Sequence, residues 1–191
     1  MIKASKNDKR NIVEILSNSF YDNQSVNYII AHRHNKEEIM ALMDYSFEQC
    51  FLHGNVYLSN DKNACALILY PQKKRFSLKT TWLDIRLIFK SIGLFRILKA
   101  LNRESAIKKL QPKIDMSYLW FIGVQPSVQH TGIGTKLLTE IIQEADSKKL
   151  PTYLETSTLH NLPWYERFGF IVYSRLELGY TLFFLKREPG I

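Results

Sequence analysis

Residues 117–149 are the part of the chain that most constrains its fold. The run SYLWFIGV (117–124) predicts a strand, and TKLLTEIIQEADSKK (135–149) predicts a helix. Between them lies QHTGIG (129–134), which carries two glycines two residues apart. The sequence therefore predicts a strand that turns into a helix through a glycine-rich loop. The helix would bury one apolar stripe, formed by Leu137, Leu138, Ile141, Ile142 and Ala145.

The glycine loop is open to two explanations. A helix N-terminus offers free N–H groups and a partial positive charge, and glycines before it let the backbone approach an anion closely. A tight turn also uses glycine for its shape alone. The loop is neither a nucleotide-binding P-loop nor a dinucleotide fingerprint, because it lacks a Gly-Lys-Ser/Thr ending and a third glycine.

The rest of the chain alternates between helix and strand patterns. Ser5, Asn7 and Asp8 are candidate helix N-caps, and Gly93 is expected to divide a helical insert at about 76–112. This order predicts one mixed α/β domain over residues 1–191, with helices packed on a sheet. The other expected elements are strands at 2–4, 55–60, 64–71, 152–157, 170–178 and 180–187, and helices through 12–20, 36–53 and 161–169.

Composition narrows the class of protein. The chain has 191 residues, of which 46% are apolar and 13% aromatic, so a disordered chain is excluded. No apolar stretch approaches the length that spans a bilayer. The polar run from Ser5 to Asn11 lacks the apolar region of a signal peptide. These features lead us to expect a cytoplasmic protein.

The two cysteines, Cys50 and Cys65, are expected to be free thiols, because cytosolic disulfides are rare. Cys50 and His53 have a spacing that metal sites use, but no second ligand pair accompanies them. No metal is therefore expected.

The formal charge of +8 could attract nucleic acid, an anionic membrane or a phosphorylated small molecule. Residues 73–113 hold twelve Lys and Arg residues, opposed only by Asp84 and Glu104. A solvated charged face explains most of this excess. The insert is basic and amphipathic enough for contact with a membrane surface, but the placement of its lysines and aromatics is not distinctive. Neither a nucleic acid nor a membrane is therefore expected as a partner.

Two motifs together resemble a known family. The pattern Q-x-x-G-x-G, on Gln129, Gly132 and Gly134, follows a strand whose end reads V-x-P. Downstream, YERFGF (165–170) is similar to the Tyr-Glu-(Lys/Arg)-x-Gly-Phe signature. In this order they resemble the GNAT N-acetyltransferases, clearly over about residues 115–175. The resemblance implies a central mixed, mostly antiparallel sheet, splayed at the strand that binds coenzyme A and flanked by helices.

Within that family, LETSTLHNLPWYERFGF (154–170) looks most like the matching stretch of puromycin N-acetyltransferase, which also has a helical segment before its CoA strand. This likeness is local, so it does not indicate that the two proteins share a substrate.

The resemblance implies that acetyl-CoA is the co-substrate. In the family, the backbone of the strand at Ile122, Gly123 and Val124 pairs with the pantetheine amides. Gly123 could also leave room for the acetyl group, or be an ordinary strand glycine at a bulge. Asn161 lies one helical turn before Tyr165 and could bind pantetheine or cap the helix. The expected pyrophosphate loop comprises Gln129, His130, Thr131, Gly132, Ile133, Gly134 and Thr135.

The implied reaction is direct attack of a neutral amine on the thioester carbonyl. Tyr165 resembles the family's proton donor to the leaving thiolate, and a phenol is still protonated at pH 7. Glu155, on the strand at 152–157, is the first candidate for the base that takes the amine proton. Glu155 could equally bind the ammonium of the substrate, and His130 is the second candidate base.

The acceptor pocket is expected to involve the insert, Phe20, Tyr21 and residues 25–34. Its apolar character favours a small-molecule amine. Acetylation of a protein and binding of acyl-CoA by a sensor without turnover remain alternatives, and a homodimer is left open.

Overall fold

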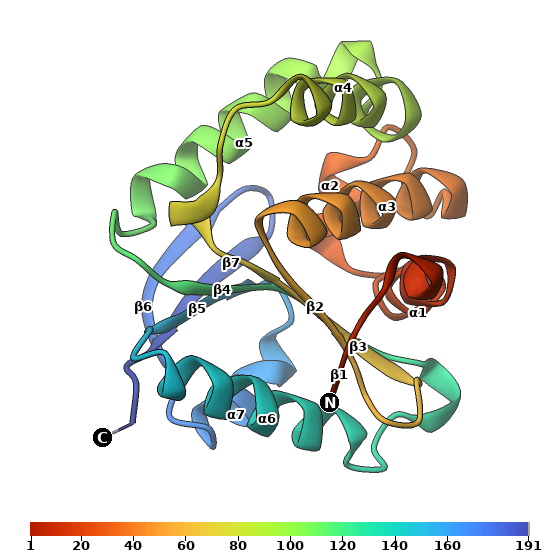
Figure 1. Ribbon diagram of the computed structural model, residues 1–191. Coiled ribbons are helices and arrows are strands. Elements are labelled where there is room, and N and C mark those ends of the chain that lie inside the picture. Colours follow the sequence, from red (N-terminus) through yellow and green to blue (C-terminus); the bar gives the residue numbers. More distant parts are fainter. Residues whose placement is uncertain (191) are drawn as a thin grey trace.

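The computed structural model describes residues 1–190 as a seven-stranded sheet with helices on both faces (Figure 1). The strand order is β1-β2-β3-β4-β5-β7-β6. Only β4 and β5 pair in parallel, and the other neighbours are antiparallel. The strands are β1 (Ile2–Lys3), β2 (Gly54–Leu58), β3 (Ala64–Leu69), β4 (Ser117–Val124), β5 (Thr152–Thr156), β6 (Ile171–Glu177) and β7 (Thr181–Arg187). The expected mostly antiparallel sheet is confirmed.

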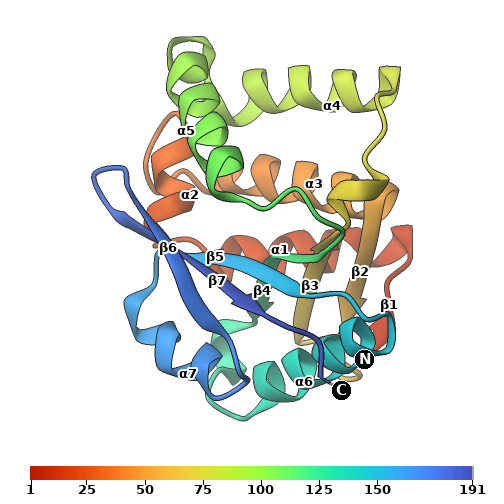
Figure 2. The same cartoon turned by 90° about the vertical axis from the view of Figure 1, so that its left-hand side faces the viewer.

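Two apolar clusters hold helices against the two faces of the sheet. On one face, α1 (Lys9–Ser19) and α3 (Lys36–His53) bury Leu16 and Phe47 completely. On the other face, α6 (Ile133–Ser147) and α7 (Leu162–Glu166) bury Leu138 and Phe170. Figures 1 and 2 show α6 and α7 below the sheet and α1 and α3 above it. Because both faces are covered, the apolar runs of β3 and β4 are explained.

The helical insert forms a further layer beyond α3. It comprises α4 (Leu78–Leu87), a π-helical turn (Ile88–Ile92), a short 3-10 turn (Leu94–Arg96) and α5 (Ile97–Leu110). Gly93 adopts a left-handed φ of 74° between the two halves, which confirms that it divides the insert. Figure 2 shows α4 stacked on α3 and remote from the strands.

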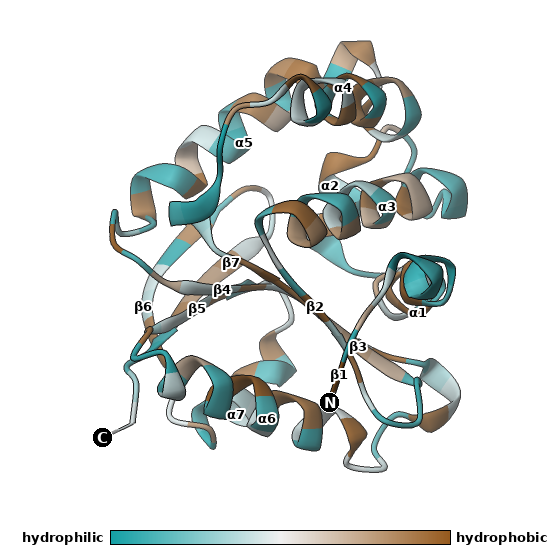
Figure 3. Cartoon of the chain, in the orientation of Figure 1, coloured by the Kyte–Doolittle hydropathy of each residue, from teal (hydrophilic) through white to brown (hydrophobic). Residues whose placement is uncertain are grey.

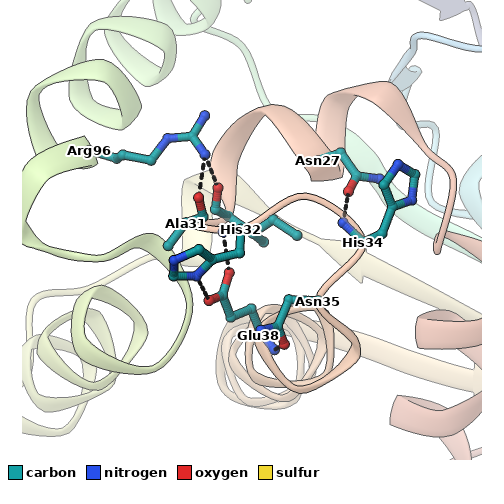
Figure 4. Close-up of polar contacts among 8 residues, drawn as sticks. Asn27, Ala31, His32, His34, Asn35, Glu38 and Arg96 are labelled. Atoms are coloured by element: carbon teal, nitrogen blue, oxygen red, sulfur yellow. Dashed lines mark hydrogen bonds and ion pairs between the residues drawn. The ribbon is translucent and has the colours of Figure 1, made fainter.

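Arg96 fastens the insert to the short helix α2 (Gln24–Ile29), which the sequence pattern did not predict. Its guanidinium donates to the carbonyls of Tyr28 (3.0 Å) and Ile30. It also donates to the carbonyl of Ala31 (2.9 Å), as Figure 4 shows. These carbonyls lie at or just after the end of α2, so the arginine satisfies groups that a helix leaves unpaired. The insert therefore has a defined position over the rest of the domain.

Two features of β4 open the sheet. Strands β4 and β5 pair only through Ser117 with Thr152 and Tyr118 with Tyr153, and then diverge. On its other side, β4 has a β-bulge at Trp120, where the register with β3 shifts. The predicted splay is therefore present, and the bulge lies three residues before Gly123.

Cys50 and Cys65 are both free and buried, on α3 and β3. No helix within residues 1–190 combines the length and apolar character needed to cross a membrane.

Candidate active site

A cavity of about 1170 Å³ fills the gap where β4 and β5 diverge. One end is lined by the glycine loop and the start of α6, the middle by β4, the end of β5 and α7, and the other end by the insert. Every residue expected to act in catalysis or to bind acetyl-CoA lines this cavity except Thr131, whose hydroxyl instead donates to the carbonyl of Val128 (2.7 Å). The structure thus brings residues from 122 to 165 to one place.

The two loop glycines serve different physical needs. Gly132 has a left-handed φ of 87° and open space where a Cβ would lie, so conformation alone favours glycine there. A Cβ on Gly134 would lie 3.1 Å from Cγ2 of Val124, so its small size lets the loop lie against the end of β4. The N–H of Lys136 donates to the carbonyl of Gly132 (3.0 Å), which begins the helix. The N–H groups of the preceding turn have no partner within the helix and can bind an anion.

The side chains around the loop fix its position more than they extend into the cavity. The amide of Gln129 donates to the carbonyl of Val124 (3.2 Å). The indole of Trp164 donates to the hydroxyl of Thr135 (3.2 Å), which joins α7 to the first turn of α6. His130 is exposed and has a φ of 65°, an uncommon value for a residue with a side chain.

Gly123 is explained by helix packing. A Cβ at this position would lie 3.0 Å from Cδ2 of Leu16 and 3.1 Å from Oγ of Ser19, both on α1. The place of its missing side chain is therefore taken by α1, which removes the reason to assign it to the acetyl group. The backbone of Ile122, Gly123 and Val124 still lines the cavity, along a segment of β4 for which no pairing with β5 exists in residues 1–190.

Tyr165 is a buried phenol at the cavity wall. Its side chain is 5% exposed and packs edge-on against Phe170. Burial raises the pKa of Tyr165, because the phenolate loses more solvation than the phenol. Its hydroxyl makes no hydrogen bond to any other residue of the described chain. Tyr165 therefore stays protonated at neutral pH and is free to donate to a ligand.

Glu155 is held by two donors that the sequence did not reveal. The side-chain amide of Gln111 donates to Oε1 (2.8 Å), and the hydroxyl of Tyr118 donates to Oε2. Burial raises the pKa of Glu155, and the two hydrogen bonds oppose that rise. Burial together with the nearby Glu155 charge raises the pKa of Tyr118, so Tyr118 remains a donor. A carboxylate in this setting can accept a proton, which is what a general base requires.

Asn161 lies at the start of α7 but forms no side-chain cap. Its side chain lines the cavity, so the capping explanation loses its support and the amide is available to a ligand. Within residues 1–190, no three His, Cys, Asp or Glu side chains are arranged to hold a metal ion.

The insert lines the far end of the cavity, where the sequence analysis places the acceptor pocket. Phe20, Tyr45 and Trp120 line this end, together with the inner face of α5. The hydroxyl of Tyr45 donates to Asp84 (2.7 Å), which joins α3 to α4 across the opening. Residues 25–34 contribute through α2, whereas Tyr21 is not among the lining residues.

Two comparisons of the sequence with known proteins find acetyltransferases. Residues 95–172 match the sequence model of a family described as the acetyltransferase (GNAT) domain. A curated protein from Schizosaccharomyces pombe, described as an uncharacterized N-acetyltransferase, is 27% identical over 92% of this chain and 76% of its own length.

Two solved structures share the fold. One, from Corynebacterium glutamicum, is described as histone acetyltransferase HPA2 and related acetyltransferase, with a TM-score of 0.75, 21% identity and coverage of 100% of this chain and 96% of that one. The other is arylalkylamine N-acetyltransferase 2 from Aedes aegypti, with a TM-score of 0.64, 14% identity and coverage of 99% and 98%. Residues 95–172 thus match the GNAT acetyltransferase domain, and the comparisons together support an acyl-CoA-dependent acetyltransferase.

Proposed function

We propose that the protein transfers an acetyl group from acetyl-CoA directly to the amine of a small molecule. The observation that carries this proposal is the placement of Glu155 and Tyr165 on one cavity between the diverging strands. The two side chains have opposite roles in proton transfer, because the Glu155 carboxylate can accept a proton and the Tyr165 phenol can donate one.

The pyrophosphate of acetyl-CoA binds the free N–H groups at the start of α6, around Gly132 and Gly134. The pantetheine arm lies along the exposed edge of β4 and reaches the amide of Asn161. The strand-like arm takes the place that β5 leaves after Tyr118.

The amine enters from the insert side and attacks the thioester carbonyl. As the new carbon–nitrogen bond forms, Glu155 takes the amine proton directly or through one water. As the carbon–sulfur bond breaks, Tyr165 donates its proton to the sulfur, so coenzyme A leaves as a thiol. The proton on Glu155 then returns through water to Tyr165, which restores both groups for the next turnover.

The lining of the acceptor end supports a small amine. The insert covers this end, and its inner face presents Leu87, Ile88 and Ile97 to the cavity. A peptide acceptor favours an open groove, which this cover restricts. Acetylation of a protein amine is the second candidate, and the likeness to a structure described as a histone acetyltransferase is the observation that favours it.

The first test is calorimetric titration of acetyl-CoA into the purified protein. It is followed by measurement of free thiol release with a panel of amines. The panel includes puromycin, arylalkylamines and short peptides with free amino groups. Binding with release that depends on a small amine supports the proposal. Release with peptides alone would replace it with the protein acetyltransferase, and binding without release from any acceptor would favour a sensor.

The residue-level test is Tyr165→Phe. We expect the turnover number to fall by about 10² to 10⁴, the usual contribution of a general acid, while acetyl-CoA binding stays within a factor of about two. Tyr173→Phe is a matched control, because Tyr173 lies on β6, away from the cavity, and its hydroxyl also lacks a hydrogen-bond partner in residues 1–190. Unchanged turnover in Tyr165→Phe would contradict the assignment.

A further inference from the structure

The insert exposes large apolar side chains that do not line the acceptor cavity. Leu78, Trp82, Ile85 and Phe89 recur at intervals of four, three and four residues, so they form one stripe along α4 and the turn that follows. All four are exposed, and Phe89 retains 68% of its accessible surface. Leu83 and Ile92, which lie outside the stripe, are buried. The side chains of the stripe therefore contribute little to the hydrophobic core of the domain.

The second half of the insert extends this surface. Phe95 is fully exposed at the turn between the helices, and Leu98 on α5 is 75% exposed. We call the surface formed by Leu78, Trp82, Ile85, Phe89, Phe95 and Leu98 the outer apolar face. Figure 3 shows hydrophobic residues along α4 and α5, and Figure 1 shows both helices at the edge of the molecule. Exposed apolar surface of this extent usually marks an interaction site.

The charge of the insert says what kind of partner this surface fits. Residues 73–113 hold twelve basic and two acidic residues, a net charge of +10, whereas the whole chain is +8. The rest of the chain is therefore net −2, so residues 73–113, which are the insert and its flanking segments, hold the entire positive excess. Lys79, Arg86 and Lys90 lie along one flank of the stripe, about 100° around the helix from it. Lys79 and Arg86 pair with Glu48 (3.5 Å) and Asp44 (3.2 Å) on α3. Arg75 and Lys90 are exposed and form no ion pair within residues 1–190, so their charges are open to a partner.

We propose that the outer apolar face docks in the plane of an anionic lipid surface. Anionic headgroups would attract the basic side chains, and the apolar layer beneath them would bury the aromatic and aliphatic side chains. A second copy of the chain fits less well, because a two-fold contact through this face would bring together two copies of residues 73–113, each of net charge +10. Nucleic acid would meet the charge but leave Leu78, Ile85 and Leu98 exposed to water.

The pattern of the sequence did not favour a membrane partner, because it could not tell which apolar residues of the insert would pack inward. The structure makes that division: Leu83 and Ile92 face inward, while Trp82 and Phe89 face outward. The docking does not depend on the acetyltransferase activity, since it uses side chains that do not line the cavity.

Sedimentation of the full chain with lipid vesicles tests the proposal. Vesicles of phosphatidylcholine with phosphatidylserine are compared with vesicles of phosphatidylcholine alone. We expect the protein to bind the anionic vesicles and to bind them more weakly as salt screens the charges. The double variant Trp82→Ser/Phe89→Ser should reduce the partition coefficient by a factor of about ten or more, because two aromatic side chains can no longer be buried in the lipid. The double variant Arg75→Glu/Lys90→Glu should reduce it by a similar factor, because it reverses the two unpaired charges.

Matched controls lie on other surfaces. Ile171→Ser removes an exposed apolar side chain on β6, and Lys3→Glu/Arg10→Glu reverses two exposed charges on β1 and α1. Both should bind vesicles like the unchanged protein. Circular dichroism and acetyl-CoA titration establish that each variant is folded.

Three outcomes would overturn the proposal. The first is no binding to anionic vesicles. The second is binding that the apolar variant leaves unchanged, because the apolar face would then play no part. The third is a dimer in light scattering that the apolar variant dissociates, because the occupant would then be a second copy.

Discussion

Replacing Gly123 by alanine should loosen α1 from β4 rather than close the acetyl-CoA groove. The added methyl would lie 3.0 Å from Cδ2 of Leu16, 3.1 Å from Oγ of Ser19 and 3.3 Å from Cβ of Ser19. Gly123 itself is held by its pairing with Cys65 on β3, so the strand cannot move away easily. The helix must shift instead, which stretches the hydrogen bond from Ser19 to the carbonyl of Val124 (2.7 Å).

The size of the effect follows from this geometry. Overpacking of a tight core contact costs about 1 to 3 kcal/mol. Replacing glycine also removes backbone freedom from the unfolded chain, which offsets roughly 0.4 to 1 kcal/mol. The net loss of unfolding free energy is about 1 to 2 kcal/mol, and the melting temperature of a chain of this size should fall by about 2 to 8 °C.

Thermal unfolding by circular dichroism measures the loss, and a double-mutant cycle locates its cause. Leu16→Val removes the δ-carbon that the new methyl would meet, so Gly123→Ala should cost clearly less in that background. The opposite pattern would refute the reasoning: an unchanged melting temperature together with a several-fold rise in KM for acetyl-CoA. Gly123 would then be a glycine that makes room for the ligand.

Four further predictions concern the site and its supports. The ratio kcat/KM should rise with pH through the raised pKa of Glu155, because the base must be ionised; a pH profile of Glu155→Gln should lack this limb. Gln111→Leu removes a hydrogen bond that stabilises the ionised carboxylate, so it should move the same limb to higher pH without abolishing it. Gly132→Ala should lower unfolding free energy by about 1 to 2 kcal/mol because of its left-handed φ, and denaturant titration should show a smaller loss for Gly132→Asn. The hydrogen bonds from Arg187 lower the pKa of Asp146 in the folded protein. The ionised carboxylate therefore stabilises the fold at pH values above the pKa of Asp146 in the unfolded chain, and this stabilisation is lost as the pH falls through the folded pKa. In acid unfolding, Asp146→Asn should lack this pH-dependent loss of stability.

The sequence predicted the elements that have a clear local signature. The strand at 117–124 was confirmed at both ends, because apolar and aromatic residues run without a break between polar neighbours. Gly93 was correctly placed as the division of the insert, since only glycine adopts its φ without strain. The short helix α2 was missed because six residues carry too little periodicity to be distinguished from a loop.

The parts that could not be predicted depend on contacts between distant residues. Gln111 and Glu155 are 44 positions apart, and nothing near either residue indicates that they meet. The reason for Gly123 lies on α1, more than a hundred residues earlier in the chain. The bulge at Trp120 is set by the register with β3, which one strand alone does not specify. The roles proposed for Glu155 and Tyr165 remain predictions for the kinetics to test.

The short contact between β4 and β5 makes the sheet two mechanical units rather than one. The unit β1–β4 and the unit β5–β7–β6 share two residue pairs, Ser117 with Thr152 and Tyr118 with Tyr153. A ligand that lies between them with strand-like hydrogen bonds turns two half-sheets into a single continuous one. Binding of such a ligand should slow the exchange of amide hydrogens with solvent in both β4 and β5. Amide exchange along β4 and β5 thus offers a readout of occupancy that needs no chemical turnover.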